Sequence, residues 1–287
     1  MKPLFTTSFI SPTALSLNAR KNKISNIKMF ENPFPGSEIG IPLNIFQDIF
    51  TNLHYGENII GINDILLQFC IGYFAYGYDR YIDSLDSKEE DLLSERKKKL
   101  YKYIKSNQEI ILISLFTCYS YIIYSLSQEI TTIPFIFLLL STFQYKNIKT
   151  NIGEFKAMYI ALLWVTSSVF IPSIKHDHDY SILFYPQDYL PGILTLFSSS
   201  NYADTLDIKE DKADNIYTLP VKYGLETSNF ISILFLLFST FLFGINPNFS
   251  NRIIPNSLFE LQNIGLIYFI LTKTESDEIE DETNIMN

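Results

Sequence analysis

Cysteine is scarce in this sequence: it has two among 287 residues, Cys70 and Cys118, and both lie inside apolar segments. A disulfide framework is therefore not expected, and both thiols are expected to pack within helices. Positive charge is also limited, with 22 Lys and Arg against 31 Asp and Glu. Because the basic residues form no patch large enough for a nucleic-acid surface, no nucleic-acid partner is expected.

The charges that are present lie unevenly along the chain. Residues 1–30 contain five basic and no acidic residues, are rich in Ser, Thr and Asn, and have no continuous apolar segment. This composition is typical of a transit peptide to a plastid or mitochondrion, with a disordered cytoplasmic N-terminus as the alternative. Residues 275–282 carry six carboxylates and no basic residue. We therefore expect disordered segments at 1–40 and 274–287 around a domain at 41–273.

Apolar residues cluster in runs that suit a lipid bilayer. Residues 109–127 and 229–245 carry almost no charge over 17 to 19 residues, close to the roughly 20 that a spanning helix needs. The segment 41–55 is amphipathic and too polar to span alone, and is expected in the interface or as a partial helix. The predicted fold is an all-α, polytopic membrane bundle of about seven or eight transmembrane helices. Seven are predicted near 58–80, 108–127, 129–143, 157–174, 186–203, 228–245 and 257–273.

The distribution of basic residues supports this segmentation. Seven spans place the loop after residue 80, the loops 145–156 and 204–227, and the tail on one side of the membrane. With Arg80 these segments hold 15 Lys and Arg residues, whereas the loops on the other side hold two, Lys175 and Arg252. Such an asymmetry is typical of membrane proteins, whose cytoplasmic loops carry the positive charge.

Two groups of aspartates follow predicted spans on the basic side. Asp79, Asp83 and Asp86 are spaced i, i+4, i+7, and so would lie on one face of a helix. Four spans later, three further aspartates have the spacing i, i+3, i+7, again one helical face: Asp204, Asp207 and Asp211.

Stacked carboxylates repel one another on a helix and therefore indicate a bound cation. Mg²⁺ takes oxygen ligands and is usually held by one or two carboxylates together with substrate phosphates. Two facing groups of aspartates would bracket a diphosphate with bridging Mg²⁺, and ionisable residues at membrane depth are functional candidates. The alternative is that each group is a solvated helix end.

The sequence resembles the UbiA superfamily of intramembrane prenyltransferases in both motifs. The segment 79–83, Asp-Arg-Tyr-Ile-Asp, is similar to the second half of the family's N-x-x-x-D-x-x-x-D. The segment 204–211, followed by Thr218-Leu219-Pro220 and Gly224, is similar to the family's second motif in order and spacing. Ala75 stands where the family has its leading Asn, and Asn215 where it usually has Gly. The family usually has nine spans.

The resemblance implies roles for individual residues. Asp79, Asp83, Asp204, Asp207 and Asp211 would be catalytic and, with Asp86, would bind Mg²⁺. Arg80 and Lys209 would contact the diphosphate. Tyr76 and Tyr202 are candidates for lining the substrate cavity, where aromatic faces stabilise an allylic cation. The run 96–99 is expected to be a solvated, lipid-facing basic cluster.

The implied activity is Mg²⁺-dependent transfer of a prenyl group from an isoprenoid diphosphate to a lipophilic acceptor, such as an aromatic quinone precursor, within the bilayer. Two alternatives stay open. A terpene cyclase would use the same aspartates but capture the cation within the prenyl chain. The other alternative is a non-catalytic membrane protein that is descended from the enzyme.

Overall fold

A computed structural model describes residues 34, 37–57, 59–86, 95–127, 132–177, 180–248 and 253–285, and among them every regular element is a helix. The expected N-terminal segment 1–40 lies mostly outside the described residues. The longer helices are α2 (Gly40–Tyr55), α3 (Ile62–Asp86), α4 (Glu95–Ser106), α5 (Gln108–Ser127), α6 (Thr132–Ile152), α7 (Lys156–Val165), α9 (Leu190–Leu206), α12 (Leu225–Gly244) and α13 (Ile253–Ile285). The shorter ones include η4 (Thr166–Phe170), α8 (Ile171–Asp177), η6 (Pro186–Asp188), α10 (Ile208–Ala213) and α11 (Leu219–Tyr223).

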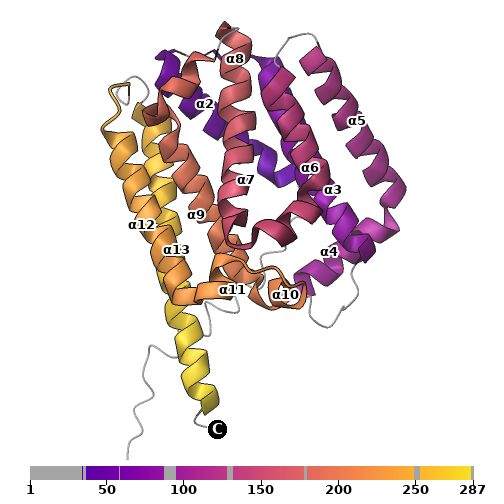
Figure 1. Ribbon diagram of the computed structural model, residues 1–287, viewed down its shortest axis with the longest axis vertical. Coiled ribbons are helices and arrows are strands. Elements are labelled where there is room, and N and C mark those ends of the chain that lie inside the picture. Colours follow the sequence, from indigo (N-terminus) through magenta and orange to yellow (C-terminus); the bar gives the residue numbers. More distant parts are fainter. Residues whose placement is uncertain are drawn as a thin grey trace, which may run out of the picture. The chain divides into compact units, whose positions relative to one another are not determined.

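The long helices run alongside one another, and α4, α10 and α11 gather at one end of them (Figure 1). Helix α9 packs against both α7 and α12, while α3 packs against α2 and α5. Helix α7, the π-helical turn η4 and α8 follow one another without a loop and form one long rod. The carboxyl ends of α3 and α9, where both aspartate motifs lie, are therefore held by neighbouring helices.

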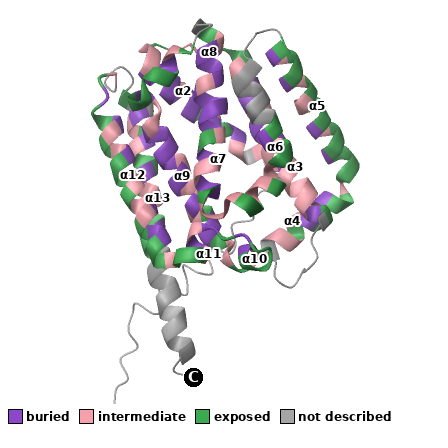
Figure 2. Cartoon of the chain, in the orientation of Figure 1, coloured by how far each residue is buried: buried purple, intermediate pink, exposed green. Residues whose placement is uncertain are grey.

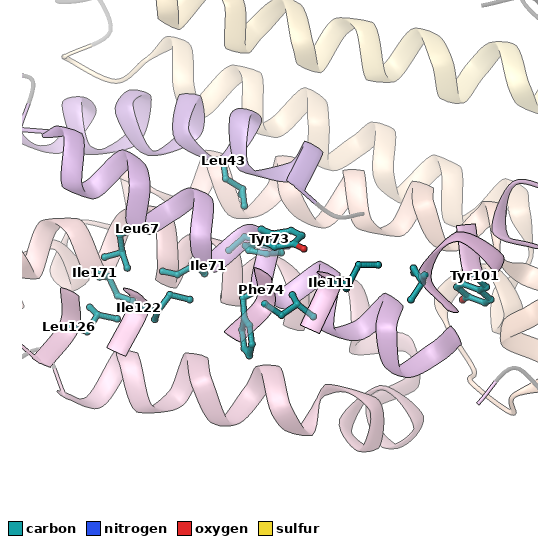
Figure 3. Close-up of a cluster of buried hydrophobic side chains, with 13 residues drawn as sticks. Leu43, Leu67, Ile71, Tyr73, Phe74, Tyr101, Ile111, Ile122, Leu126 and Ile171 are labelled. Carbon is teal, nitrogen blue, oxygen red and sulfur yellow. The ribbon is translucent and has the colours of Figure 1, made fainter. Parts of the chain in front are cut away.

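One apolar cluster fixes α3 against α5 (Figure 3). Leu67, Ile71 and Phe74 recur at helical spacing on α3 and pack with Ile111 and Ile122 of α5. Gly72 allows α2 to approach, because a Cβ at this position would lie 3.3 Å from the side chain of Leu43 on α2 and 3.0 Å from that of Ile39 just before it. The face of α3 that carries Asp79 and Asp83 therefore has a fixed orientation.

Buried polar side chains join α9 to α12 and α13. Thr195 Oγ1 lies 2.9 Å from Ser239 Oγ and donates to Asn263 at 3.0 Å. Further along α9, Asn201 Nδ2 donates to Ser232 Oγ at 2.7 Å. Hydrogen bonds between helices are common in membrane bundles, where an unpaired polar group would face hydrocarbon. These bonds fix the rotation of α9 and hence the direction of Asp204.

Three helical stretches among the described residues are long and apolar enough to cross a membrane: 108–127, 147–176 and 225–244. Two of them, α5 and α12, expose much of their apolar surface, as Figure 2 shows; Phe116 on α5 and Phe230 on α12 are 70% and 65% exposed. The stretch 147–176 is mostly buried inside the protein. Exposed apolar surface of this extent is compatible with an integral membrane protein. All seven predicted segments lie largely in helices, and the spanning role of the other four stays a prediction.

Residues 41–55 form α2, and Leu43, Phe50 and Leu53 of this helix pack inside the protein. Of the two expectations for this segment, its packing favours a partial helix of the bundle over a helix that lies in the interface. Helix α13 continues to Ile285 and so extends into the acidic segment 274–287, which suits the good helix propensity of glutamate. The expected disorder of this segment stays a prediction.

Candidate functional site

The first aspartate motif lies on an unbroken helix, because α3 extends to Asp86. Asp79 and Asp83 are one turn apart on it, as the spacing predicts, while the side chain of Asp86 lies outside the described residues. Lys149 of α6 points its ammonium at this motif, with Nζ 3.5 Å from Asp83 Oδ1. Asp79 lies within the electrostatic range of Asp83, Lys149 and Lys156.

The second motif does not lie on one helix, which corrects the sequence-based expectation. Helix α9 ends at Leu206, Asp207 has φ −109° and ψ 12°, and α10 starts at Ile208. This break turns Asp207 away from its neighbours in the motif. Asp204 and Asp211 both face Lys156, whose Nζ lies 2.8 Å from Asp204 Oδ1 and 3.5 Å from Asp211 Oδ2.

Asp207 pairs instead with Lys97 of α4. Lys97 Nζ lies 2.9 Å from Asp207 Oδ1 and also donates to Glu210 of α10. Burial lowers the pKa of Lys97, but its hydrogen bond to Glu210 and the charge of Asp207 outweigh burial and hold that pKa above its ordinary value. Lys97 had been assigned to a lipid-facing basic cluster; that assignment is wrong, because the charged partners on α10 bind it inside the protein.

Lys156 and the carboxylates around it are strongly buried. Lys156, Asp204 and Asp211 are 8%, 5% and 7% exposed. Burial raises the pKa of Asp211, although the charge of Lys156 acts in the opposite direction. Thr218 Oγ1 donates to Asp211 Oδ2 at 3.3 Å and gives this carboxylate a second partner. Charges this deep are tolerated only when paired, so this ion-paired group fixes α7, α9 and α10 together.

The two motifs share one electrostatic environment. Tyr145 of α6 lies close enough to Asp79, Asp204 and Asp211 for the charges of all three to act on its hydroxyl group. Burial raises the pKa of Tyr101 on α4, and the nearby negative charges of Asp83 and Glu210 raise it further. Aspartates that are far apart in sequence therefore converge at the end of the bundle where α4 and α10 lie (Figure 1).

The aromatic and basic residues predicted from sequence lie at different depths. The ring of Tyr76 stacks on Trp164 with centroids 5.4 Å apart and an angle of 9° between the planes. The charges of Asp79 and Asp204 act on the Tyr76 hydroxyl group. Arg80 acts on Asp79. By contrast, Lys209 is exposed on α10 and Tyr202 is half-buried on α9. Tyr76 and Arg80 thus lie near the carboxylates, as predicted. The predicted contacts of Lys209 and Tyr202 with the substrate stay predictions.

The sequence reasoning did not single out Lys156, Lys97 or Glu210. Lys156 had a usable signal, because it directly precedes the uncharged, largely apolar run 157–174, and charges at such positions are functional candidates. Lys97 had none, since a run of four basic residues at 96–99 does not reveal which of them turns inward.

The backbone explains two positions of the second motif. Asn215 has φ 57° and Gly224 has φ 86°. Asn is the residue that best tolerates the left-handed region after Gly, so Asn215 is suited to the position where the resemblance leads one to expect Gly. Pro220 lies in the first turn of α11, where its missing N–H costs nothing.

Among the described residues, no group of three or more His, Cys, Asp or Glu lies close enough to hold a metal ion by itself. The donors at the site are carboxylate oxygens, which suit Mg²⁺, and that ion commonly takes one or two carboxylates with phosphate oxygens completing its shell. The pairs Asp79 with Asp83 and Asp204 with Asp211 would fit such a partial shell.

Comparison with known proteins finds no family model, curated protein or solved structure that matches this chain. The likeness to the UbiA superfamily therefore rests on the motifs themselves.

Proposed function

We propose that this protein is a Mg²⁺-dependent membrane prenyltransferase that transfers a prenyl group from an isoprenoid diphosphate to a lipophilic acceptor. The observation that carries the proposal is that lysines pair with aspartates of both motifs. Lys156 Nζ lies 2.8 Å from Asp204 and 3.5 Å from Asp211 of the second motif, and Lys149 Nζ lies 3.5 Å from Asp83 of the first.

The residues at the site suit the charge of a diphosphate. Lys97, Lys149 and Lys156 come from three elements and supply ammonium groups. Asp79, Asp83, Asp204 and Asp211 supply oxygen ligands for Mg²⁺, which would stabilise the diphosphate as the C–O bond breaks. Tyr76 and Trp164 present stacked aromatic rings near these acids, and such faces stabilise a nearby cation by about 0.5–2 kcal/mol.

A bilayer location supports a lipophilic acceptor. The exposed apolar faces of α5 and α12 would contact lipid, so an acceptor dissolved in the bilayer would reach the protein from the side.

One observation favours a second candidate, a non-catalytic membrane protein. Three lysines pair with Asp83, Asp204, Asp207 and Asp211, as they would in a purely structural ion-pair network. Buried ion-pair networks of this kind fix helices in register in some proteins.

The two candidates are separated by turnover. Membranes containing the full-length protein would be incubated with radiolabelled geranylgeranyl diphosphate, Mg²⁺ and a mixture of aromatic acceptors, and the lipids would be extracted and chromatographed. We expect a labelled lipid that disappears with EDTA and in the variant Asp204→Asn. If several prenyl chain lengths give no Mg²⁺-dependent diphosphate release, the protein is not this enzyme.

A further inference from the structure

We infer, on the basis of the proposed function, that Lys156 is a built-in competitor of the metal. Its ammonium holds Asp204 and Asp211 while the site is empty, and it transfers to the diphosphate when Mg²⁺ takes these carboxylates. Metal and diphosphate then bind together, and neither binds well alone.

The local charges explain why the metal binds poorly by itself. One ammonium lies between two carboxylates, at 2.8 Å and 3.5 Å, and all three residues are more than nine-tenths buried. A divalent cation entering this group meets a positive charge already in place on both of its ligands. Because the surroundings exclude water, repulsion between the ion and the ammonium is only weakly screened.

A diphosphate removes this obstacle. It offers oxygens to which the Lys156 ammonium can turn, and it adds the negative charge that a second cation requires. Lys156 therefore links the two binding events: the diphosphate raises the affinity for the metal, and by thermodynamic reciprocity the metal raises the affinity for the diphosphate by the same factor.

Lys97 repeats the arrangement on the neighbouring carboxylates. Its ammonium lies between Asp207 and Glu210, and it comes from α4 rather than α7. Lys149 takes a similar place beside Asp83. Three lysines thus pair with five carboxylates of the two motifs and offset part of their negative charge.

The test measures metal binding without substrate. Purified full-length protein in detergent would be titrated with Mn²⁺, as a substitute for Mg²⁺, and free Mn²⁺ followed by electron paramagnetic resonance. We expect weak binding by the wild type and about tenfold tighter binding by Lys156→Met, which lies within the range usual for coupled sites. Lys156→Arg keeps the charge and should bind as weakly as the wild type.

Lys222→Met is the matched control. It also removes a lysine from an ion pair, but that pair joins exposed Lys222 to Glu154, at 2.6 Å, and includes none of the aspartates of the two motifs. Its affinity for Mn²⁺ should equal that of the wild type. Should Lys156→Met not fold, Lys97→Met makes the same comparison at Asp207 and Glu210.

A second measurement keeps this inference separate from the proposed function. Inorganic diphosphate and Mg²⁺ together should raise the unfolding temperature of the wild-type protein, whereas each alone should not. If the pair of ligands gives no stabilisation, the proposed function fails. If the pair stabilises the protein but the lysine-to-methionine variant binds Mn²⁺ no more tightly than the wild type, the competitor role of the lysine is overturned while the proposed function stands.

Discussion

Lys156 Nζ lies 2.8 Å from Asp204 Oδ1, and this buried ion pair joins the first residue of α7 to the last turn of α9. Each residue requires the other to compensate its charge, because both are almost fully buried. Losing one partner leaves a buried charge poorly compensated, whereas losing both removes the charges together. The pair therefore has a structural and a chemical contribution that mutations can separate.

We predict that Asp204→Asn lowers the free energy of unfolding by about 3 kcal/mol and abolishes diphosphate release. Adding Lys156→Met should restore only part of the stability, because it removes the buried ammonium but leaves the buried Asp211 carboxylate paired with Thr218 alone, and it should restore none of the activity. Thermal unfolding in detergent and a diphosphate-release assay give the two quantities. Activity recovering in parallel with stability would show that Asp204 has only a structural role.

Asp83→Ala and Asp207→Ala should each abolish turnover while the protein stays folded. The side chains of Asp83 and Asp207 are 26% and 36% exposed, so the loss of either ion pair costs at most about 1 kcal/mol of stability. Asp214→Ala is the control, because Asp214 is an exposed acid beside the second motif and should retain activity. Near-normal turnover of either variant at saturating Mg²⁺ would remove that aspartate from the site.

The sequence alone was sufficient for the helical class and for placing Asp79 and Asp83 one turn apart on a helix, because apolar periodicity and helical spacing are local properties. It was insufficient for the second motif and for the direction of Asp207. A helix continuing through residues 204–211 and one broken at Asp207 have the same polar pattern, and the sequence does not show that Asp207 pairs with Lys97 of α4. For the same reason α2 was expected at the interface: its buried apolar face is explained only by the partners that cover it.

The two loops that border the site should face the same compartment. Ser106 at the end of α4 and Asp214 after α10 are both exposed, and Lys97 joins these two elements by ion pairs. In a background with Cys70→Ser and Cys118→Ser, Ser106→Cys and Asp214→Cys should both react with an impermeant maleimide from one side of sealed vesicles. Labelling from opposite sides would contradict the shared site.

Gly224 should be replaceable only at a cost in stability. It has φ 86° and ψ 164°, a region that is essentially restricted to glycine, where other residues cost about 1–3 kcal/mol. A Cβ at Gly224 would meet nothing within 4 Å, so the cost of Gly224→Ala would come from the backbone rather than from a clash. Asn215→Gly, at a φ that Asn already tolerates, should be close to neutral. Equal unfolding temperatures for the wild type and Gly224→Ala would show that α11 and α12 can be joined in another conformation.

The last prediction separates a transferase from a cyclase. Both would ionise the prenyl diphosphate with the same aspartates, so no aspartate variant distinguishes them; the difference lies in what meets the cation. A transferase requires an acceptor from the bilayer, whereas a cyclase requires only the double bonds of its own substrate. We expect diphosphate release by the purified protein with Mg²⁺ to depend on an added aromatic acceptor, and the lipid product to contain both label and acceptor. A cyclic hydrocarbon released from the prenyl diphosphate alone would establish the cyclase instead.

Trp164→Leu provides an internal check, because it removes the ring stacked on Tyr76 at 5.4 Å. A cyclase that folds its substrate against this stack would change its products in this variant, whereas a transferase would slow down but form the same bond to the same acceptor.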